Sequence, residues 1–186
     1  KNAFRKALDI DRNYGVAHLA LANVLFAENE MLAASEHYEL AIRNGEKAAY
    51  VYYNLGNTYY YMNEFVSASN NYKKAMEGDP KNPDYPYNLG LCYVKSGKLN
   101  AALEQFKFTT DLDDNYLEAH YNQGKVYFDL DDDMETMRIG NMLIEMDPDY
   151  GKGYLLMALV YNKRKDYGNM DKYLKLAKKL DPSLRL

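Results

Sequence analysis

The tetrapeptide Tyr-Asn-Leu-Gly stands at residues 53–56 and again at 87–90, and Tyr-Asn-Gln-Gly follows at 121–124. The asparagines of these three segments are 34 residues apart. A fixed period of this length is typical of repeat architectures, in which each unit is one supersecondary element. The spacing therefore predicts a chain built from 34-residue units.

Other positions recur with the same period. A small residue occupies the eighth position of each unit, and proline closes three units, at Pro80, Pro148 and Pro182. Without a gap, the units run over 15–48, 49–82, 83–116, 117–150 and 151–184, and residues 1–14 match the end of a preceding unit. The eighth position holds Ala22, Gly56, Gly90, Gly124 and Ala158.

This joint pattern resembles the tetratricopeptide repeat, a helix–turn–helix unit, along the whole chain. The resemblance implies an all-α fold: a right-handed α-solenoid in which residues 1–186 form a single array. Because the chain opens inside a unit and no additional polar helix follows the last one, we expect it to be a piece of a longer protein, or to pack its ends on something else.

Hydrophobic periodicity agrees with paired helices. Leu55, Tyr59 and Met62 share one helical face by their spacing. Glycine inside a helix costs roughly 0.5–1 kcal/mol relative to alanine. Gly56 therefore needs a compensating reason, and we expect close approach of the partner helix at Ala68 to supply it.

Composition indicates an ordinary soluble protein, with 47% apolar and 27% charged residues. No segment approaches the length of a membrane span, and no signal peptide is present. The compartment stays unknown; the cytoplasm is slightly favoured and the periplasm remains open. The net charge of −4 and a groove without a cationic stripe argue against nucleic acid as a partner.

Catalytic and metal sites find no support in the residue pattern, so we expect no enzyme and no cofactor. His18 and His120 share the fourth position of their units with tyrosines, which indicates packing residues. Cys92 is the only cysteine, and its position holds small apolar residues elsewhere. Neither histidine nor cysteine has metal-ligand spacing.

An acidic run at 129–135 has some likeness to a calcium loop. However, Met134 stands where such a loop needs glycine, and Gly140 stands where it needs glutamate. We therefore interpret the run as a turn whose acids cap the following helix.

The first helix of each unit carries the strongest functional signal. In the resembling family these helices line a concave groove. The groove positions, which we expect to bind a peptide, hold Asn23, Tyr50, Tyr53, Asn54, Asn57, Tyr60, Tyr61, Tyr87, Asn88, Leu91, Tyr121, Asn122 and Lys125. The same positions at the two ends of the array hold Leu19, Leu155, Leu156 and Leu159.

The chemistry of this surface suggests the class of partner. A carboxamide both donates and accepts, so one asparagine can meet the N–H and C=O of an extended peptide. Tyrosine offers broad contact area with a polar tip. We therefore expect a protein or extended peptide segment, mostly neutral or apolar. Family members that hold a chaperone's C-terminal tail use cations where this chain has Leu19, Asp84 and Asn88, so that partner is disfavoured.

Two alternatives stay open beside a peptide-binding scaffold. Residues 111–150 hold 12 acidic and 2 basic side chains, whereas 151–186 hold 9 basic and 3 acidic. These opposed charges and the exposed terminal helices suggest a homo-oligomer assembled head to tail. The chain could instead be the targeting arm of a larger multidomain protein.

The fourth unit departs from the pattern, because Gly140 and Leu143 exchange a large and a small residue. We predict an altered helix crossing there. The methionines of this region form an irregular core or a second partner site; they are Met134, Met137, Met142, Met146 and Met157.

Overall fold

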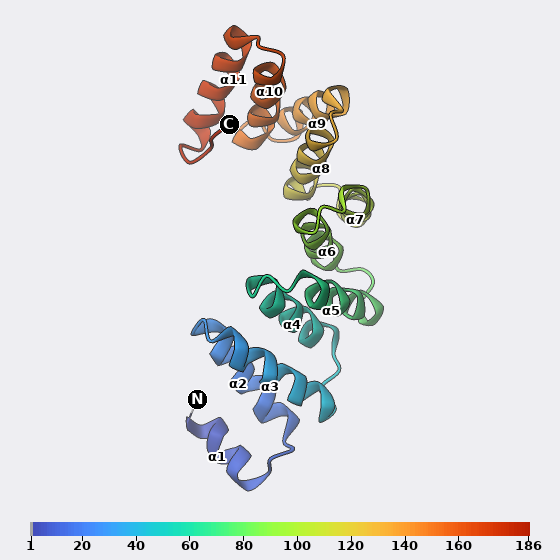
Figure 1. The fold of residues 1–186 in the computed structure, drawn as a ribbon, viewed down its shortest axis with the longest axis vertical. Helices are drawn as coiled ribbons and strands as arrows, with labels where there is room; N and C mark the ends of the chain where they lie inside the picture. Colours follow the sequence, from blue (N-terminus) through green and yellow to red (C-terminus); the bar gives the residue numbers. More distant parts are fainter. Residues whose placement is uncertain (1) are drawn as a thin grey trace. The chain divides into compact units, whose positions relative to one another are not determined.

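The computed structural model describes residues 2–186, which form eleven α-helices and no strand. The helices are α1 (Asn2–Ile10), α2 (Gly15–Ala27), α3 (Met31–Arg43), α4 (Ala49–Tyr61), α5 (Phe65–Gly78), α6 (Asp84–Lys95), α7 (Leu99–Leu112), α8 (Leu117–Asp129), α9 (Asp133–Met146), α10 (Gly151–Lys163) and α11 (Tyr167–Leu180) (Figure 1). The all-α helical repeat expected from the sequence is confirmed.

The helices divide into two compact units. The first unit ends at Gly97 and contains α1 to α6, and the second covers Lys98–Leu186 and contains α7 to α11. Within the units, α2 packs on α3, α4 on α5, α8 on α9 and α10 on α11 (Figure 1). Each of these hairpins also packs on the helix that follows or precedes it, for example α3 on α4 and α9 on α10. None of the helices in the described residues is long and apolar enough to cross a membrane.

The turn between the two helices of a hairpin is the same at every repeat. The residue with positive φ is Asn29, Asn63, Gly97, Asp131 and Lys165, spaced by one period, with φ between 60° and 70°. After Asn29, Asn63, Asp131 and Lys165 the next N–H donates to the carbonyl oxygen five residues back, as in Glu64 N to the Tyr59 carbonyl oxygen at 2.9 Å. This bond closes the end of the first helix with the left-handed residue that such caps require.

The hairpin core places a small residue on the first helix against a large ring on the second. Tyr72 is fully buried, and a β-carbon at Gly56 would lie 2.7 Å from its Cε1 atom. Gly56 is therefore needed for contact with Tyr72. The expectation that Ala68 makes the close approach was wrong, because the tyrosine ring fills the space between the two helices.

The irregular fourth repeat is filled from the helix that follows it. A β-carbon at Gly140 would lie 3.0 Å from Met157 Sδ and 3.2 Å from the Gly153 carbonyl oxygen, so α10 approaches α9 closely there. A β-carbon at Gly124 would lie 2.4 Å from Leu156 Cδ1, again a side chain of α10. Leu143 is fully buried, so a large apolar side chain fills the core one helical turn after Gly140.

The methionines of this region do not form one cluster. Met157 is buried, whereas Met134 is 80% exposed and Met146 is 38% exposed. Met137 and Met142 are half-buried. Met157 thus lies in the interior, and Met142 packs against the core cluster of Ile139, Leu143 and Leu156.

Candidate peptide-binding face

In the first unit, asparagine side chains connect the first helices of successive repeats. Asn54 Nδ2 on α4 lies 3.5 Å from Asn23 Oδ1 on α2. Asn88 Nδ2 on α6 donates to the Tyr53 hydroxyl on α4 at 3.3 Å and to the Asp84 carbonyl oxygen at 2.7 Å. Asn54 and Asn88 are half-buried, so they are neither sealed beneath other helices nor free in solvent. We call the surface of α2, α4 and α6 that carries these side chains the amide face.

Two of the expected ligand-binding asparagines also serve the hairpins. The Tyr38 hydroxyl donates to Asn23 Oδ1 at 2.6 Å, and the Tyr72 hydroxyl donates to Asn57 Oδ1 at 2.7 Å. Burial raises the pKa of Tyr38 to about 12, so this hydroxyl keeps its proton and its donor role. The side-chain oxygens of Asn23 and Asn57 are thus used inside their own hairpins.

The sequence holds a signal for this pairing. The two positions carry asparagine and tyrosine together in the first two full repeats. In the third repeat they carry Leu91 and Phe106, so both polar groups are absent together. Loss of the asparagine alone would leave the hydroxyl of a buried tyrosine without its acceptor, which is costly.

The tyrosines of the amide face fall into two groups. Tyr50 is 50% exposed and Tyr61 is 64% exposed, and the Tyr61 ring lies 5.8 Å from that of Phe26. Tyr53, by contrast, packs on Tyr72 and Tyr85 with ring centroids 5.9 and 5.1 Å apart. Tyr60, Tyr87 and Leu91 are half-buried. The open aromatic area is therefore supplied mainly by Tyr50 and Tyr61.

In the second unit, the equivalent surface on α8 is more charged than the sequence led us to expect. Lys152 Nζ lies 2.7 Å from Glu118 Oε2 and 5.2 Å from the centre of the Tyr121 ring. Asn122 Nδ2 donates to the Glu118 carbonyl oxygen at 2.8 Å. Burial, followed by the charge of Glu118, raises the pKa of Tyr121 to about 12. Lys125 is half-buried on the same helix.

Comparison with known proteins agrees with the geometry. A "TPR repeat" family matches residues 56–97, and a "Tetratricopeptide repeat" family matches residues 151–184. Both matched segments are tetratricopeptide repeats, as the resemblance predicted. Proteins of this family generally act as non-enzymatic scaffolds for protein–protein interaction.

Solved tetratricopeptide repeat structures share the fold. YrrB, described as a TPR protein with an unusual peptide-binding site, is 24% identical, with a TM-score of 0.75 over 97% of this chain and 93% of its own. MamA is 19% identical, with a TM-score of 0.79 over 92% and 97%. PilF of Pseudomonas aeruginosa is 24% identical, with a TM-score of 0.75 over 97% and 82%. No curated protein matches the chain.

Some apolar residues of this tetratricopeptide repeat chain do not lie where we expected them. Leu19 is 8% exposed, Leu155 is 4% exposed and Leu156 is fully buried. They pack in the hairpin cores, and Leu156 fills the space beside Gly124. The expectation that these three leucines extend the open surface was therefore wrong.

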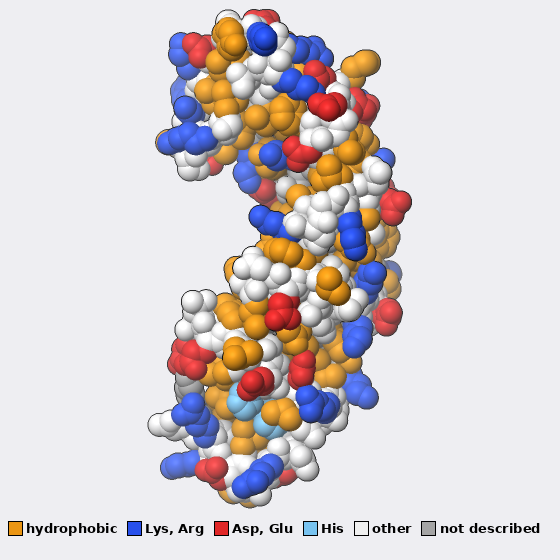
Figure 2. All heavy atoms as spheres, viewed as in Figure 1, with side chains coloured by type: hydrophobic (Ala, Val, Ile, Leu, Met, Phe, Trp, Pro, Cys, Tyr) orange, Lys and Arg blue, Asp and Glu red, His pale blue; other side chains and the backbone are white. Residues whose placement is uncertain are grey.

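The histidines hold the chain together locally. His18 is 5% exposed; its Nε2 lies 2.9 Å from the Arg12 carbonyl oxygen, and its Nδ1 lies 2.9 Å from His37 Nδ1. Because a carbonyl only accepts, Nε2 of His18 is the donor in its contact with Arg12. Figure 2 shows histidine side chains together on the surface of the first unit. His120 Nε2 similarly faces the Asp114 carbonyl oxygen at 2.9 Å.

The remaining reactive groups are also accounted for. Cys92 is fully buried, and burial raises the pKa of its thiol to about 11, which disfavours the thiolate. The described residues contain no group of three or more side chains suited to a metal ion.

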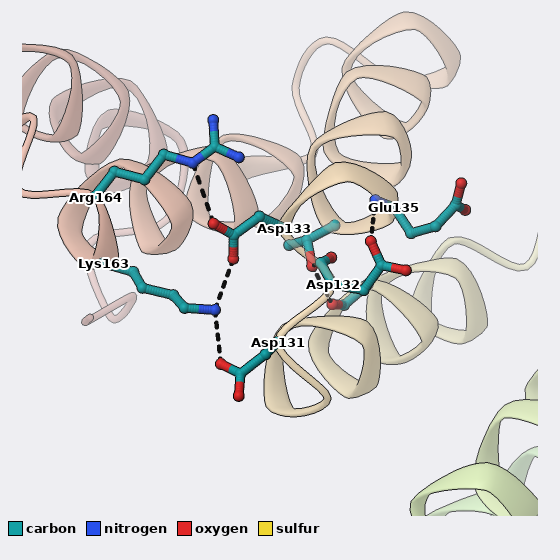
Figure 3. A network of polar contacts seen from close by, with 8 residues as sticks. Asp131, Asp132, Asp133, Glu135, Lys163 and Arg164 are labelled. Atoms are coloured by element: carbon teal, nitrogen blue, oxygen red, sulfur yellow. Dashed lines mark hydrogen bonds and ion pairs between the residues drawn. The ribbon is translucent and has the colours of Figure 1, made fainter.

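The acidic turn of the second unit caps a helix, as predicted. Asp132 accepts from the Glu135 backbone N–H at 3.0 Å (Figure 3). Lys163 Nζ lies 2.8 Å from both Asp131 and Asp133, and Arg164 Nε lies 3.1 Å from Asp133. These partners were not expected from the sequence, although acidic and basic residues at the same turn of successive repeats were a signal for them.

The charges of this turn therefore pair within the second unit. Lys163 and Arg164 come from the basic segment, and Asp131 and Asp133 come from the acidic one (Figure 3). These charges are therefore already paired, and they are not available for the head-to-tail contacts with another copy that the sequence led us to expect.

Proposed function

We propose that the amide face of the first unit binds an extended, mostly uncharged segment of a partner protein. Support comes from Asn54 and Asn88, which are half-buried beside the exposed rings of Tyr50 and Tyr61. Carboxamides at a repeat spacing suit a ligand held through its backbone, and tyrosines add broad contact area. The peptide-binding site described for YrrB, which has the same fold, agrees with this use.

The observation that carries the proposal is the state of Asn54. Its Nδ2 makes a long contact of 3.5 Å to Asn23 Oδ1, and its side chain also contacts the Tyr38 hydroxyl, whereas Asn88 and Asn122 bond the backbone of their own helices. An amide with unused hydrogen-bonding capacity between exposed aromatic rings is suited to a peptide backbone. A peptide held by its C-terminal carboxylate would need cations, and we expect none at this face.

The test uses a peptide selected against the full chain from a displayed library. Its dissociation constant would be measured by calorimetry for the Tyr50→Ala, Asn54→Ala and Tyr61→Ala variants, singly and combined. Loss of a hot-spot tyrosine is expected to weaken binding by about tenfold or more.

The matched control is Tyr167→Ala, because Tyr167 is 59% exposed on α11, outside the amide face. Its affinity should equal that of the unchanged chain. Equal affinity of the triple variant, with its helical content retained, would exclude the amide face as the binding site.

A further inference from the structure

An open cavity of about 390 Å³ lies in the first unit between α3 and α5. Tyr52, Leu55 and Tyr59 of α4 contribute to its lining, and Leu55 is buried. Their spacing places them on another side of α4 from Asn54 and Asn57. The cavity is therefore separate from the amide face, and the volume is in the range of small ligand sites.

The last hairpin shows what occupies the equivalent place. Tyr161 of α10 corresponds to Tyr59, and Tyr173 of α11 corresponds to Asn71, each three periods later. The rings of Tyr161 and Tyr173 are stacked, with centroids 5.5 Å apart and planes 14° from parallel. The chain thus uses a second aromatic ring at this position of the repeat.

In the first unit that second ring is missing. Asn71 is half-buried, and its Nδ2 donates to the Ser67 carbonyl oxygen at 2.9 Å, so the side chain turns back along its own helix. Tyr59, Ser67 and Asn71 all line the cavity. The space that Tyr173 takes in the last hairpin is open here.

The charges around the cavity favour an anion. The Tyr59 hydroxyl donates to Glu39 Oε1 at 2.6 Å, and Arg43 lies 3.1 Å from Glu39 Oε2. The carboxylate of Glu39 is therefore already paired. Lys74 Nζ lies 5.4 Å from the centre of the Tyr52 ring, and no carboxylate of the described chain lies within ion-pair distance of it.

We propose that this cavity binds a tyrosine side chain of a partner protein that is followed by an acidic residue. The ring takes the place beside Tyr59 that Tyr173 takes beside Tyr161. The neighbouring carboxylate pairs with Lys74. Stacking of this kind adds only modestly to the contribution of the buried area, so the isolated motif binds weakly and serves as one anchor of a longer contact.

The probe is the dipeptide N-acetyl-Tyr-Glu-amide, titrated into the ¹⁵N-labelled full chain and followed by NMR. We expect saturable shifts of the Asn71 side-chain amide and of backbone amides in α3 and α5, with a dissociation constant of about 1–10 mM. N-acetyl-Ala-Glu-amide should cause no saturable shift, and N-acetyl-Tyr-Gln-amide should bind several-fold more weakly.

Two substitutions locate the probe. Asn71→Tyr reproduces the natural Tyr161–Tyr173 pair, so it should fold normally and weaken binding about tenfold or more by filling the cavity. Asn71→Asp keeps the size and should also weaken binding, through repulsion of the carboxylate. Asn54→Ala on the amide face should leave the dissociation constant unchanged, which separates this site from the proposed function.

Three outcomes would overturn the proposal. One is the absence of saturable shifts at about 10 mM probe. Another is shifts confined to helices other than α3, α4 and α5. The third is an unchanged dissociation constant in both Asn71 variants.

Discussion

At Gly56 the backbone of α4 runs against the ring of Tyr72. The nearest ring carbon would be 2.7 Å from a β-carbon placed there, and the ring is fully buried, so it has little room to move. We predict that Gly56→Ala lowers the free energy of unfolding by about 1–3 kcal/mol, because the cost of overpacking exceeds the gain in helix propensity. Urea unfolding followed by circular dichroism would measure the loss.

The matched control for Gly56 is Gly168, which lies in the first turn of α11. The nearest atom to a β-carbon at Gly168 is Asp166 Oδ1 at 3.7 Å, an ordinary contact. Gly168→Ala should therefore be neutral or stabilising by up to about 1 kcal/mol. Equal losses for both variants would show that the Tyr72 contact does not decide the effect.

The Asn57–Tyr72 hydrogen bond is predicted to act as a coupled pair. Tyr72→Phe should cost about 1 kcal/mol, because Asn57 Oδ1 loses its donor. Adding Asn57→Leu, which copies Leu91 and Phe106, should recover part of that loss. A double-mutant cycle in urea measures the coupling, and additive effects of the two changes would contradict it.

The sequence predicts which residues recur at a position of the repeat. It does not predict that one side chain can lie on the amide face and also bond inside its own hairpin. Asn23 and Asn57 occupy face positions, yet their oxygens accept from Tyr38 and Tyr72 inside the hairpins. Face assignment rests on the angle around a helix, and that angle does not report which way a long side chain turns.

Turns are the elements in which the repeat is strictest. Lys165 has a φ of 60°, at a position held elsewhere by asparagine, aspartate or glycine. A left-handed residue with a β-carbon costs roughly 1–2 kcal/mol, so we predict that Lys165→Gly raises the melting temperature. Gly97→Ala, at a φ of 70°, should lower it, and an increase there would contradict this explanation.

The acidic turn links α9 to α10 through ion pairs that depend on pH and salt. A hydrogen bond from Lys163, and next one from Arg164, lower the pKa of Asp133 below its ordinary value of 3.8. The group therefore contributes stability above pH 4, and this contribution is lost as the pH falls through the folded pKa. Asp133→Asn should reduce the slope of stability against pH below about pH 4.

Salt provides the control for this turn. The pairs lie at the surface, where Asp131 is 86% and Arg164 44% exposed, so their contribution is small and should decline further as added salt screens it. Identical pH and salt dependence of the unchanged chain and Asp133→Asn would show that the network contributes nothing measurable.

The helix boundaries repeat with the period of the sequence, and the left-handed turn residue between the helices of a hairpin recurs every 34 residues. The outer cavity between α3 and α5 could not be predicted in this way. It arises from the absence of a ring at Asn71, and an absence becomes visible only when Tyr161 and Tyr173 show the filled version.

At the scale of the whole molecule, the chain divides into two compact units. Stability in repeat arrays is approximately a sum of terms between neighbours, so a local defect should fade along the chain. In native-state hydrogen exchange, Gly56→Ala should speed exchange in α4 and α5 most strongly and leave α10 and α11 unchanged. Equally faster exchange in all helices would mean that the chain unfolds as one cooperative body.

The family could be identified from the sequence, whereas the partner could not. The fold follows from residues that repeat, whereas the surroundings of the repeated asparagines differ, as between Asn54, which contacts Asn23, and Asn122, which lies beside the Glu118–Lys152 pair. Periodicity carries no information about those differences, and their chemistry becomes clear only from their neighbours in space.

The matched asparagine and tyrosine of the first two full hairpins bear on how such genes grow. A crossover inside a hairpin would join a first helix that carries asparagine to a second helix that carries phenylalanine. The asparagine carboxamide of the product would lack its tyrosine donor. Exchange at the boundary between hairpins inherits both partners at once. Duplication and shuffling of this chain should therefore be tolerated in whole 34-residue steps and selected against in halves.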